Sequence, residues 1–405
     1  MHEDNFILNA ARLNLLEKNI AVLKKIPKQN IDWPLFEKKA FAHGVDTFIY
    51  YSLKNHNLSE LIPPETYKKF QEHYYQVAYQ NSVFLDEVNK LSAIIDDKIV
   101  LLKGMDLIQT LYPNIAIRSM VDIDILVDSE KDRDIWNKLK IHGFEEHDTE
   151  KDKDSWDKGI TNGFAKSGLE VAKSSLHSTR LSNARYRHLP DLFNGRCHLQ
   201  VHWNIFERPQ FSVKTKMAWE KAIPINSDKK IFRLSNEFLL LHLCSHLYSH
   251  KHQFILLRML CDINELILKQ GSIIDWNEIN EICTDSELKN IITTALTYAH
   301  ILLNTPVPTD FVNEKLIIKK TNILDSLAKG NKRSSQFSNY LIILNSISKP
   351  ADRIKYVFRT IIPVREWMNE NYHTRSGIKL VMAYLKYWLF QLNTNIIKRG
   401  IRNVN

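Results

Sequence analysis

The sequence predicts an α+β protein in which a small mixed sheet lies between helical regions on its N-terminal and C-terminal sides. Apolar residues recur at helical spacing before residue 95 and after residue 234, whereas short strand-like runs alternate with helical patterns between them. The chain has 11 glycines and 12 prolines in 405 residues, which is few for turn-rich sandwiches and propellers. Helices joined by short loops account better for this composition.

Three parts follow from the pattern. Residues 1–95 form the predicted N-terminal helical region. Residues 96–232 form the predicted α/β core, with a polar insertion at 148–196 that is rich in Lys, Ser, Asp and Asn. Residues 233–405 form the predicted C-terminal helical domain.

The core contains three apolar runs that read as strands, at 98–103, 120–128 and 197–207, with helical patterns following the first two. This strand–helix–strand–helix order is typical of a small α/β module. Further helices are predicted at 276–303, 309–328, 336–347, 350–361 and 376–398.

Glycine, proline and capping side chains mark where the predicted helices begin and end. Gly44 separates two short N-terminal helices, and Pro113 ends the helix that follows the first core strand. A capping pattern at Ser129 starts the next helix, which stops at Gly143. Ser235 caps the first helix of the C-terminal domain.

Charge and cysteine usage limit the class of protein. The net charge is +9, but lysines are spread along the chain among acids, which favours solvated helix faces and argues against a nucleic-acid partner. The four cysteines are scattered without a Cys-x-x-Cys pair, as in a reducing compartment. No signal peptide and no apolar run of membrane-spanning length are visible. We therefore expect a cytoplasmic protein.

Two aspartates lie inside the second core strand. Alternation along Val121–Ile125 puts Asp122 and Asp124 on one face and the aliphatic residues on the other. Carboxylates on a buried strand are costly without a partner, and hard cations such as Mg²⁺ or Mn²⁺ are suitable partners. We predict that both aspartates bind metal, although two solvated acids on an edge strand would give the same pattern.

Residues that could bind phosphate lie next to these aspartates. Lys103 and Gly104 stand where the first strand passes into a helix, and glycine there would let a phosphate approach the free backbone N–H groups. Arg118 could hold phosphate oxygens with two parallel hydrogen bonds, or it could be a surface arginine paired with an acid. We predict a triphosphate site formed by these three residues.

The run LLKGMDLIQTLYPNIAIRSMVDIDILV, residues 101–127, resembles the core motif of a bacterial family of uncharacterised nucleotidyltransferases, nucleotidyltransferase family 5. The family belongs to the polymerase-beta-like nucleotidyltransferase superfamily, and the resemblance covers roughly residues 30–270. It implies a nucleotidyltransferase core, with metal on Asp122 and Asp124. The implied reaction moves a nucleotidyl group from a nucleoside triphosphate, expected to be ATP, to an acceptor.

One position departs from the pattern of this family. The third carboxylate is expected two residues before the histidine of the His-Trp strand, and this chain has Gln200 there. Glutamine can accept a hydrogen bond but cannot act as a base or supply charge. His202, for which we predict a catalytic role, or Glu207 could take over; the sequence does not choose between them.

The leading hypothesis is therefore a Mg²⁺-dependent nucleotidyltransferase with an unidentified hydroxyl-bearing acceptor, which could be a small molecule, a peptide or a protein. Gln200 is predicted to bind the nucleotide together with Lys103, Gly104 and Arg118. The alternative is a catalytically degenerate protein that binds a nucleotide or a partner, because the position of the third carboxylate is Gln200. An RNA-binding protein is a third possibility, but it would need a single basic face, and interspersed acids argue against one.

Two features of the later helices have ordinary structural explanations. His242, His246 and His250 lie four residues apart on one helix face, a spacing that can hold zinc. We favour histidines packed against the core module. Arg258 and Asp262 are also four apart and are predicted to form an ion pair on their helix, with Asp262 placed to anchor the junction to the core.

Overall fold

The computed structural model describes residues 2–146, 188–189, 191–206, 211–225, 230–250, 256–284, 286–314, 324 and 377–392. The chain forms two compact units, Met1–Gly330 and Asn331–Asn405. In the second unit the described element is helix α19, Ile378–Leu392. The division into domains at residues 95 and 232 stays a prediction.

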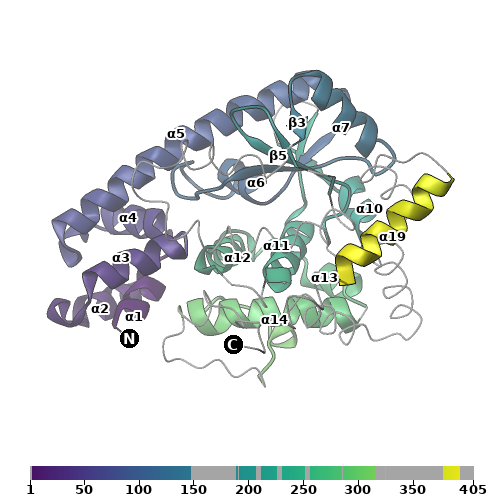
Figure 1. The fold of residues 1–405 in the computed structure, drawn as a ribbon. Coiled ribbons are helices and arrows are strands. Elements are labelled where there is room, and N and C mark those ends of the chain that lie inside the picture. The colour runs from purple at the N-terminus through teal and green to yellow at the C-terminus, as the bar shows by residue number, and fades with distance from the viewer. Residues whose placement is uncertain are drawn as a thin grey trace, which may run out of the picture. The chain divides into compact units, whose positions relative to one another are not determined.

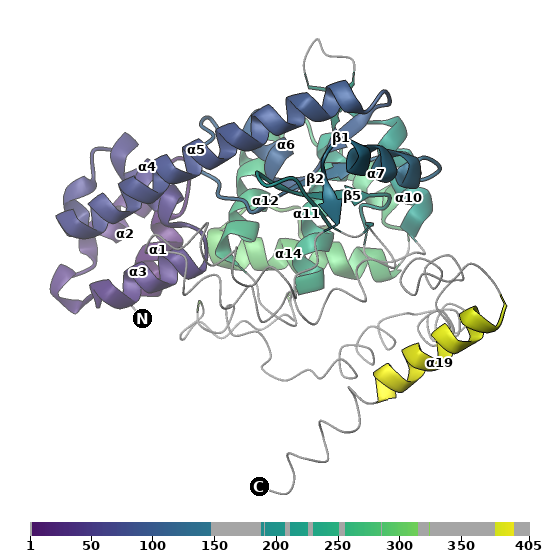
Figure 2. The same cartoon turned by 45° about the horizontal axis from the view of Figure 1, so that its top comes forward.

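The N-terminal part of the first unit is helical, as predicted. Its α-helices are α1 His2–Ala10, α2 Glu17–Lys25, α3 Trp33–Ala42, α4 Asp46–Asn55 and α5 Pro64–Ile94, with short 3₁₀ turns at Lys28–Asn30 and Ser59–Leu61. Gly44 separates α3 from α4 with a φ of +64°, a conformation that favours glycine. Helix α5 runs from the N-terminal helices across to the sheet (Figures 1 and 2).

The described strands form one mixed sheet in the order β3-β4-β5-β2-β1-β7-β6. The strands are β1 Ile99–Leu101, β2 Asp122–Leu126, β3 Glu145–Glu146, β4 Leu192–Phe193, β5 His198–His202, β6 Ile223–Pro224 and β7 Ile231–Arg233. Strand β2 lies near the middle, antiparallel to β1 and parallel to β5. The predicted α+β class with helical flanks is confirmed.

Three helices connect or cover the strands: α6 Lys103–Thr110, α7 Asp132–Ile141 and α10 Ser212–Glu220. The predicted start of α7 is wrong, because the helix begins at Asp132 and its N-cap position is Lys131 rather than Ser129. The predicted end is right, since Gly143 follows the helix with a φ of +92°. A turn, in which Glu130 N–H donates to Asp128, precedes the helix.

The later helices of this unit are α11 Asn236–His250, α12 Leu257–Gln270, α13 Trp276–Ile282 and α14 Ser286–Leu303. Ser235 caps α11 as predicted, because its hydroxyl accepts the N–H of Phe238 at 3.4 Å. Helices α11, α12 and α14 pack against one another below the sheet in the view of Figure 1. A 3₁₀ turn, Thr309–Phe311, follows, and most of the predicted helices at 309–361 lie outside the described residues.

A single continuous hydrophobic core runs from the N-terminal helices through the sheet to α14. Helix α12 contacts the N-terminal helices directly, since Arg258 N–H donates to the carbonyl of His43 and Glu265 accepts the N–H of Leu13. The helices that flank the sheet therefore share one packed interior, which can fix the position of the loops between the strands.

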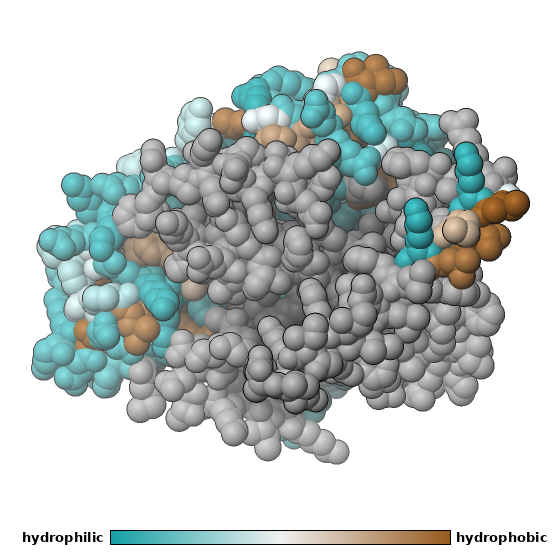
Figure 3. Space-filling view, in the orientation of Figure 1, coloured by the Kyte–Doolittle hydropathy of each residue, from teal (hydrophilic) through white to brown (hydrophobic). Residues whose placement is uncertain are grey.

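On the face drawn in Figure 3, the described residues are mostly hydrophilic, apart from scattered brown groups and a cluster on α19. That cluster is made of Ile378, Val381, Met382 and Leu385, which are exposed at helical spacing. In the described part of the chain, no helix combines the length and the apolar character that crossing a bilayer requires. All four cysteines are buried free thiols.

Candidate functional site

Strand β2 presents its two aspartates on the same face, as its alternation predicts. Asp122 is partly buried and Asp124 is 4% exposed, while Ile123 and Ile125 on the other face are fully buried. The aliphatic side chains anchor that face in the core. The strand therefore holds two carboxylates in a partly water-excluded position, where they need compensation.

Asp124 is compensated by two cationic or hydrogen-bonding side chains. Lys103 Nζ donates to its Oδ1 at 2.7 Å, and His202 Nε2 lies 2.7 Å from the same oxygen. Burial opposes ionisation of Asp124, but the charge of Lys103 and the hydrogen bond with His202 hold its pKa well below the usual range. Lys103 and His202 are themselves almost fully buried.

The backbone of Lys103 is held in an unusual conformation to make this contact. Its φ is +47°, in the left-handed region that non-glycine residues seldom adopt. The preceding residue, Leu102, donates its N–H to the carbonyl of Asp124 at 3.0 Å, so the pairing of β1 with β2 continues up to the turn. The turn then directs the lysine ammonium back onto the carboxylate.

Gly104 is needed here for packing space. A Cβ atom at this position would lie 2.5 Å from Arg118 Nη1 and 2.8 Å from Met120 Sδ, distances that packed side chains do not tolerate. The absence of a side chain at Gly104 thus lets Arg118 pack against the start of α6. The predicted phosphate-binding role of Gly104 stays a prediction.

Arg118 forms a buried ion pair with Asp262 of α12. Its Nε donates to both carboxylate oxygens, at 3.0 and 3.1 Å, and its Nη2 donates to Oδ2 at 2.9 Å. Tyr112 adds a hydroxyl hydrogen bond to Oδ1 at 2.6 Å. The predicted ion pair between Asp262 and Arg258 is wrong, because Arg118 takes the carboxylate with a better matched fork of donors.

Other helices hold the loop that carries Arg118. Asn81 of α5 donates to the carbonyls of Ile115 and Arg118 at 2.6 and 2.9 Å. Arg258 of α12 donates to the carbonyl and the hydroxyl of Ser119 at 2.6 and 2.9 Å. The entry into β2, and with it the position of the first aspartate, is therefore set by helices from both ends of the unit.

Asp122 has less compensation than Asp124. Burial, the charge of Asp124 and the charge of Asp191 together raise its pKa to about 7, against the opposing effect of Lys103 and Arg118. Two neighbouring acids with divergent pKa values are common at functional sites and in structural charge networks alike. Beside Asp122, the carboxylates of Asp124 and Asp191 would favour the binding of an additional positive charge.

Asp191 is a residue of this site that the sequence did not point out. The β4–β5 register places it beside Gln200, whose Nε2 donates to its Oδ2 at 3.4 Å. His188 Nδ1 lies 3.6 Å from its Oδ1. The only sequence signal was an acid just before a short apolar pair, Leu192–Phe193, inside a polar segment.

The donor set fits a hard divalent cation in its chemistry. Mg²⁺ binds carboxylate oxygens and commonly takes one or two of them, with water and phosphate completing its shell. Asp122 and Asp124 supply such oxygens, and both contacts of Asp124 use Oδ1. Within the described ranges, no three His, Cys, Asp or Glu side chains are arranged to hold an ion. Asp122 and Asp124 are thus the two carboxylates that such an ion would use.

The remaining predicted residues lie elsewhere or outside the described part. Glu207 is outside it. His242 is buried and its Nδ1 lies 2.8 Å from the carbonyl of Ile205, so it packs against the core as predicted. His246 stacks on His242 and lies edge-on to His250.

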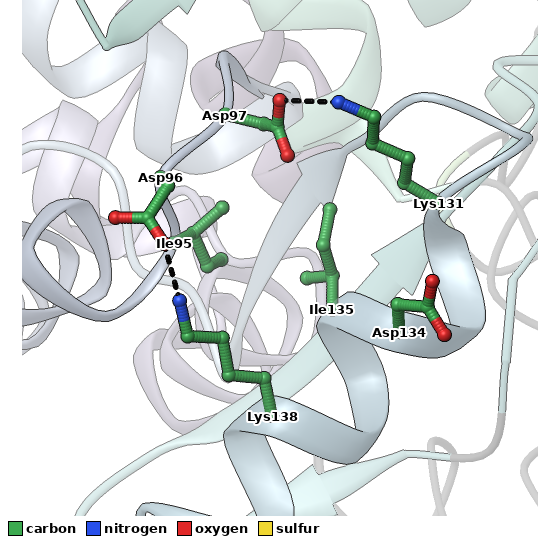
Figure 4. Close-up of a pocket in the computed structure, with 7 residues that line it drawn as sticks. All are labelled: Ile95, Asp96, Asp97, Lys131, Asp134, Ile135 and Lys138. Carbon is green, nitrogen blue, oxygen red and sulfur yellow. Dashed lines mark hydrogen bonds and ion pairs between the residues drawn. The ribbon is translucent and has the colours of Figure 1, made fainter.

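A shallow pocket lies at the other end of β1 from Lys103. It is lined by Ile95, Asp96, Asp97, Lys131, Asp134, Ile135 and Lys138. Figure 4 shows both lysines paired with acids, Lys131 with Asp97 and Lys138 with Asp96. Since its ammonium groups are neutralised, this pocket is a poor anion site and is not part of the candidate site.

The mixed sheet with helical flanks is consistent with the core of a nucleotidyltransferase. A family model described as uncharacterised nucleotidyltransferase matches residues 29–304, about two thirds of the chain. The chain belongs to this family. Comparison with curated proteins and with solved structures found no match.

Proposed function

We propose that the protein transfers a nucleotidyl group from a nucleoside triphosphate, with ATP as the first candidate, to a hydroxyl-bearing acceptor in the presence of Mg²⁺ or Mn²⁺. The observation that carries this proposal is the pair of carboxylates on β2, of which Asp122 has a pKa raised to about 7 and Asp124 a pKa held low. Membership of the family supports the reaction class.

In this proposal Asp122 and Asp124 hold the cation. When bound, the cation would neutralise phosphate charge and favour attack at the α-phosphorus. Lys103, at the start of α6, would donate to phosphate oxygens from the same turn that now directs it to Asp124. The helix start adds backbone N–H groups that favour anions.

Arg118 and His202 act mainly by positioning in this proposal. Arg118 uses Nε and Nη2 for Asp262. A phosphate would be met by Nη1, which faces the Gly104 turn and now donates to the carbonyl of Ser119 at 3.4 Å. His202 orients Asp124 through Nε2. The catalytic role predicted for His202 from the sequence stays a prediction.

The test is nucleotidyl transfer by the purified full-length chain. The protein is incubated with Mg²⁺ or Mn²⁺ and each α-labelled nucleoside triphosphate, with a cell extract as acceptor source, beside Asp122→Asn/Asp124→Asn. We expect metal-dependent pyrophosphate release and labelled product that the double variant loses. Release that persists in the double variant would contradict the proposal.

A degenerate nucleotide-binding protein is the second candidate, and Gln200 favours it because the expected third acid is absent. This candidate predicts metal-dependent triphosphate binding that is lost in Asp122→Asn/Asp124→Asn. It also predicts that no label is transferred from any of the nucleoside triphosphates tested. Equilibrium binding of each labelled triphosphate is measured on the same samples as pyrophosphate release. Binding without release across a broad extract favours this candidate, whereas release that depends on the extract identifies an enzyme.

A further inference from the structure

Gln200 and Asp191 lie opposite each other beside the candidate metal site. In the antiparallel pair β4–β5, Leu192 is the partner of Leu199, and continuing this register by one residue puts Asp191 opposite Gln200. In the parallel pair β2–β5, Asp124 is the partner of Gln200. Residues directly opposite in a sheet share a face, so these three side chains form a row across β2, β5 and β4.

The contact between the two side chains orients the amide of Gln200. Its Nε2 donates to Asp191 Oδ2 at 3.4 Å, and Oε1 therefore points to the other side of the amide. Oε1 is buried and accepts no hydrogen bond in the part of the chain that the structure describes. A buried oxygen without a donor is costly, and a water molecule or an ion can satisfy such an atom.

We propose that Gln200 and Asp191 together form the third oxygen donor of the cation site, with Gln200 Oε1 as the ligand and Asp191 as the charge that orients and polarises its amide. This inference rests on the proposed function. An amide oxygen brings no charge of its own. A carboxylate that accepts the amide N–H increases electron density on the oxygen and fixes its direction, as carboxylates do behind metal-bound histidines.

The charge of Asp191 reaches the site independently of this hydrogen bond, since it is one of the charges that raise the pKa of Asp122. His188 Nδ1 lies 3.6 Å from Asp191 Oδ1 and makes a hydrogen bond with the carbonyl of Leu189, at 2.7 Å. Asp191, beside Gln200 and directly before the neighbouring strand β4, therefore supplies the negative charge that Gln200 lacks.

A merely structural contact between the neighbouring strands β4 and β5 would make a different prediction. Removing it would lower the stability of the fold and leave cation affinity unchanged. The inference instead predicts that removing either member weakens cation binding, and that exchanging the two side-chain types restores it. Since the exchange keeps one amide and one carboxylate in contact, it preserves both the hydrogen bond and the charge.

The experiment measures Mn²⁺ alone binding to the full-length chain, by calorimetry and by loss of the free-Mn²⁺ electron paramagnetic resonance signal. We expect Asp191→Asn and Gln200→Met each to weaken Mn²⁺ binding by about tenfold or more. The double variant Asp191→Asn/Gln200→Met should bind Mn²⁺ about as weakly as either single variant. The exchange variant, Asp191→Asn/Gln200→Glu, should recover most of the affinity. Asp134→Asn removes the same charge from α7, outside the site, and should bind like the wild type.

The outcomes separate this inference from the proposed function. Binding by Asp191→Asn at wild-type affinity, with binding lost in Asp122→Asn, would overturn the inference and leave the function standing. Failure of the exchange variant to regain affinity would also overturn it. No binding by the wild type, or undiminished binding by Asp122→Asn, would overturn both. Circular dichroism melts of every variant identify any that fails to fold, and the inference is then decided on the remaining variants.

Discussion

Arg118 and Asp262 are 144 residues apart in the sequence and form a buried ion pair with three hydrogen bonds. The pair joins the loop before β2 to helix α12, and Tyr112 completes the coordination of the carboxylate. Because Arg118 also lies against the Gly104 turn, the same contact ties the predicted triphosphate site to the C-terminal helices of the unit.

We expect Asp262→Ala to lower the free energy of unfolding by about 3–5 kcal/mol, because it leaves the buried guanidinium of Arg118 uncompensated. The double variant Arg118→Met/Asp262→Leu removes both charges and should recover most of this loss. Urea unfolding measures both. If the double variant is as unstable as the single one, lost packing rather than an unpaired charge is the cause.

Gly104→Ala should lower the free energy of unfolding by about 1–3 kcal/mol, because the added Cβ would overlap Arg118 Nη1 and Met120 Sδ. Combining it with Met120→Ala opens space on one side. In a double-mutant cycle, Gly104→Ala should therefore lower the free energy of unfolding by less in the Met120→Ala background than in the wild type. Thermal melts measure this difference. If Gly104→Ala lowers stability equally in the wild type and in Met120→Ala, the proposed overlap is contradicted.

Much of the helical part could be predicted because its signals are local. Gly44, Gly143 and Ser235 act on the helix ends next to them, and the structure places those ends where the signals predict. Three short strands of the sheet could not be predicted in this way. Each of β3, β4 and β6 has two residues, too few to show an alternation, and their pairing depends on partners distant in the sequence.

In the candidate site too, local sequence signals predicted the contacts between nearby residues and missed those between distant ones. Asp122, Asp124 and Lys103 lie in one short stretch, and their grouping follows from strand alternation and a single turn. The spacing of four residues between Arg258 and Asp262 suggested a helix pair, but a distant arginine with better geometry takes the carboxylate. Asp191 was missed for a similar reason, because its place beside Gln200 comes from a strand register rather than from sequence spacing.

Lys103→Met should weaken nucleoside triphosphate binding by about tenfold or more, because it removes a charge-assisted donor to phosphate. Among the described residues, it also leaves His202 as the one side-chain partner of Asp124, which increases repulsion of an anionic ligand. Lys131→Met is the matched control, since it removes the same charge from an exposed ion pair with Asp97. Equal affinities of the two variants, measured by equilibrium binding with Mg²⁺, would exclude Lys103 from the triphosphate site.

Asp106, in the first turn of α6, is fully buried and should make stability depend on pH. Burial raises its pKa to about 7 from 3.8, although the charge of Arg233 and a hydrogen bond from Thr110 act in the opposite direction. The unfolded chain releases this proton near pH 4, whereas the folded chain retains it up to about pH 7. The contribution of Asp106 to stability is therefore largest below pH 4 and falls as the pH rises to 7.

Asp106→Asn removes this dependence and can keep the hydrogen bond from Thr110 to Oδ1, which is 2.9 Å long. The melting temperature of the variant minus that of the wild type should thus rise between pH 5 and pH 7, by an amount that corresponds to roughly 2 kcal/mol, and then level off. Melts of both proteins in matched buffers from pH 5 to pH 8 measure the difference. A constant difference over this range would mean that Asp106 is already ionised at pH 5 in the folded chain.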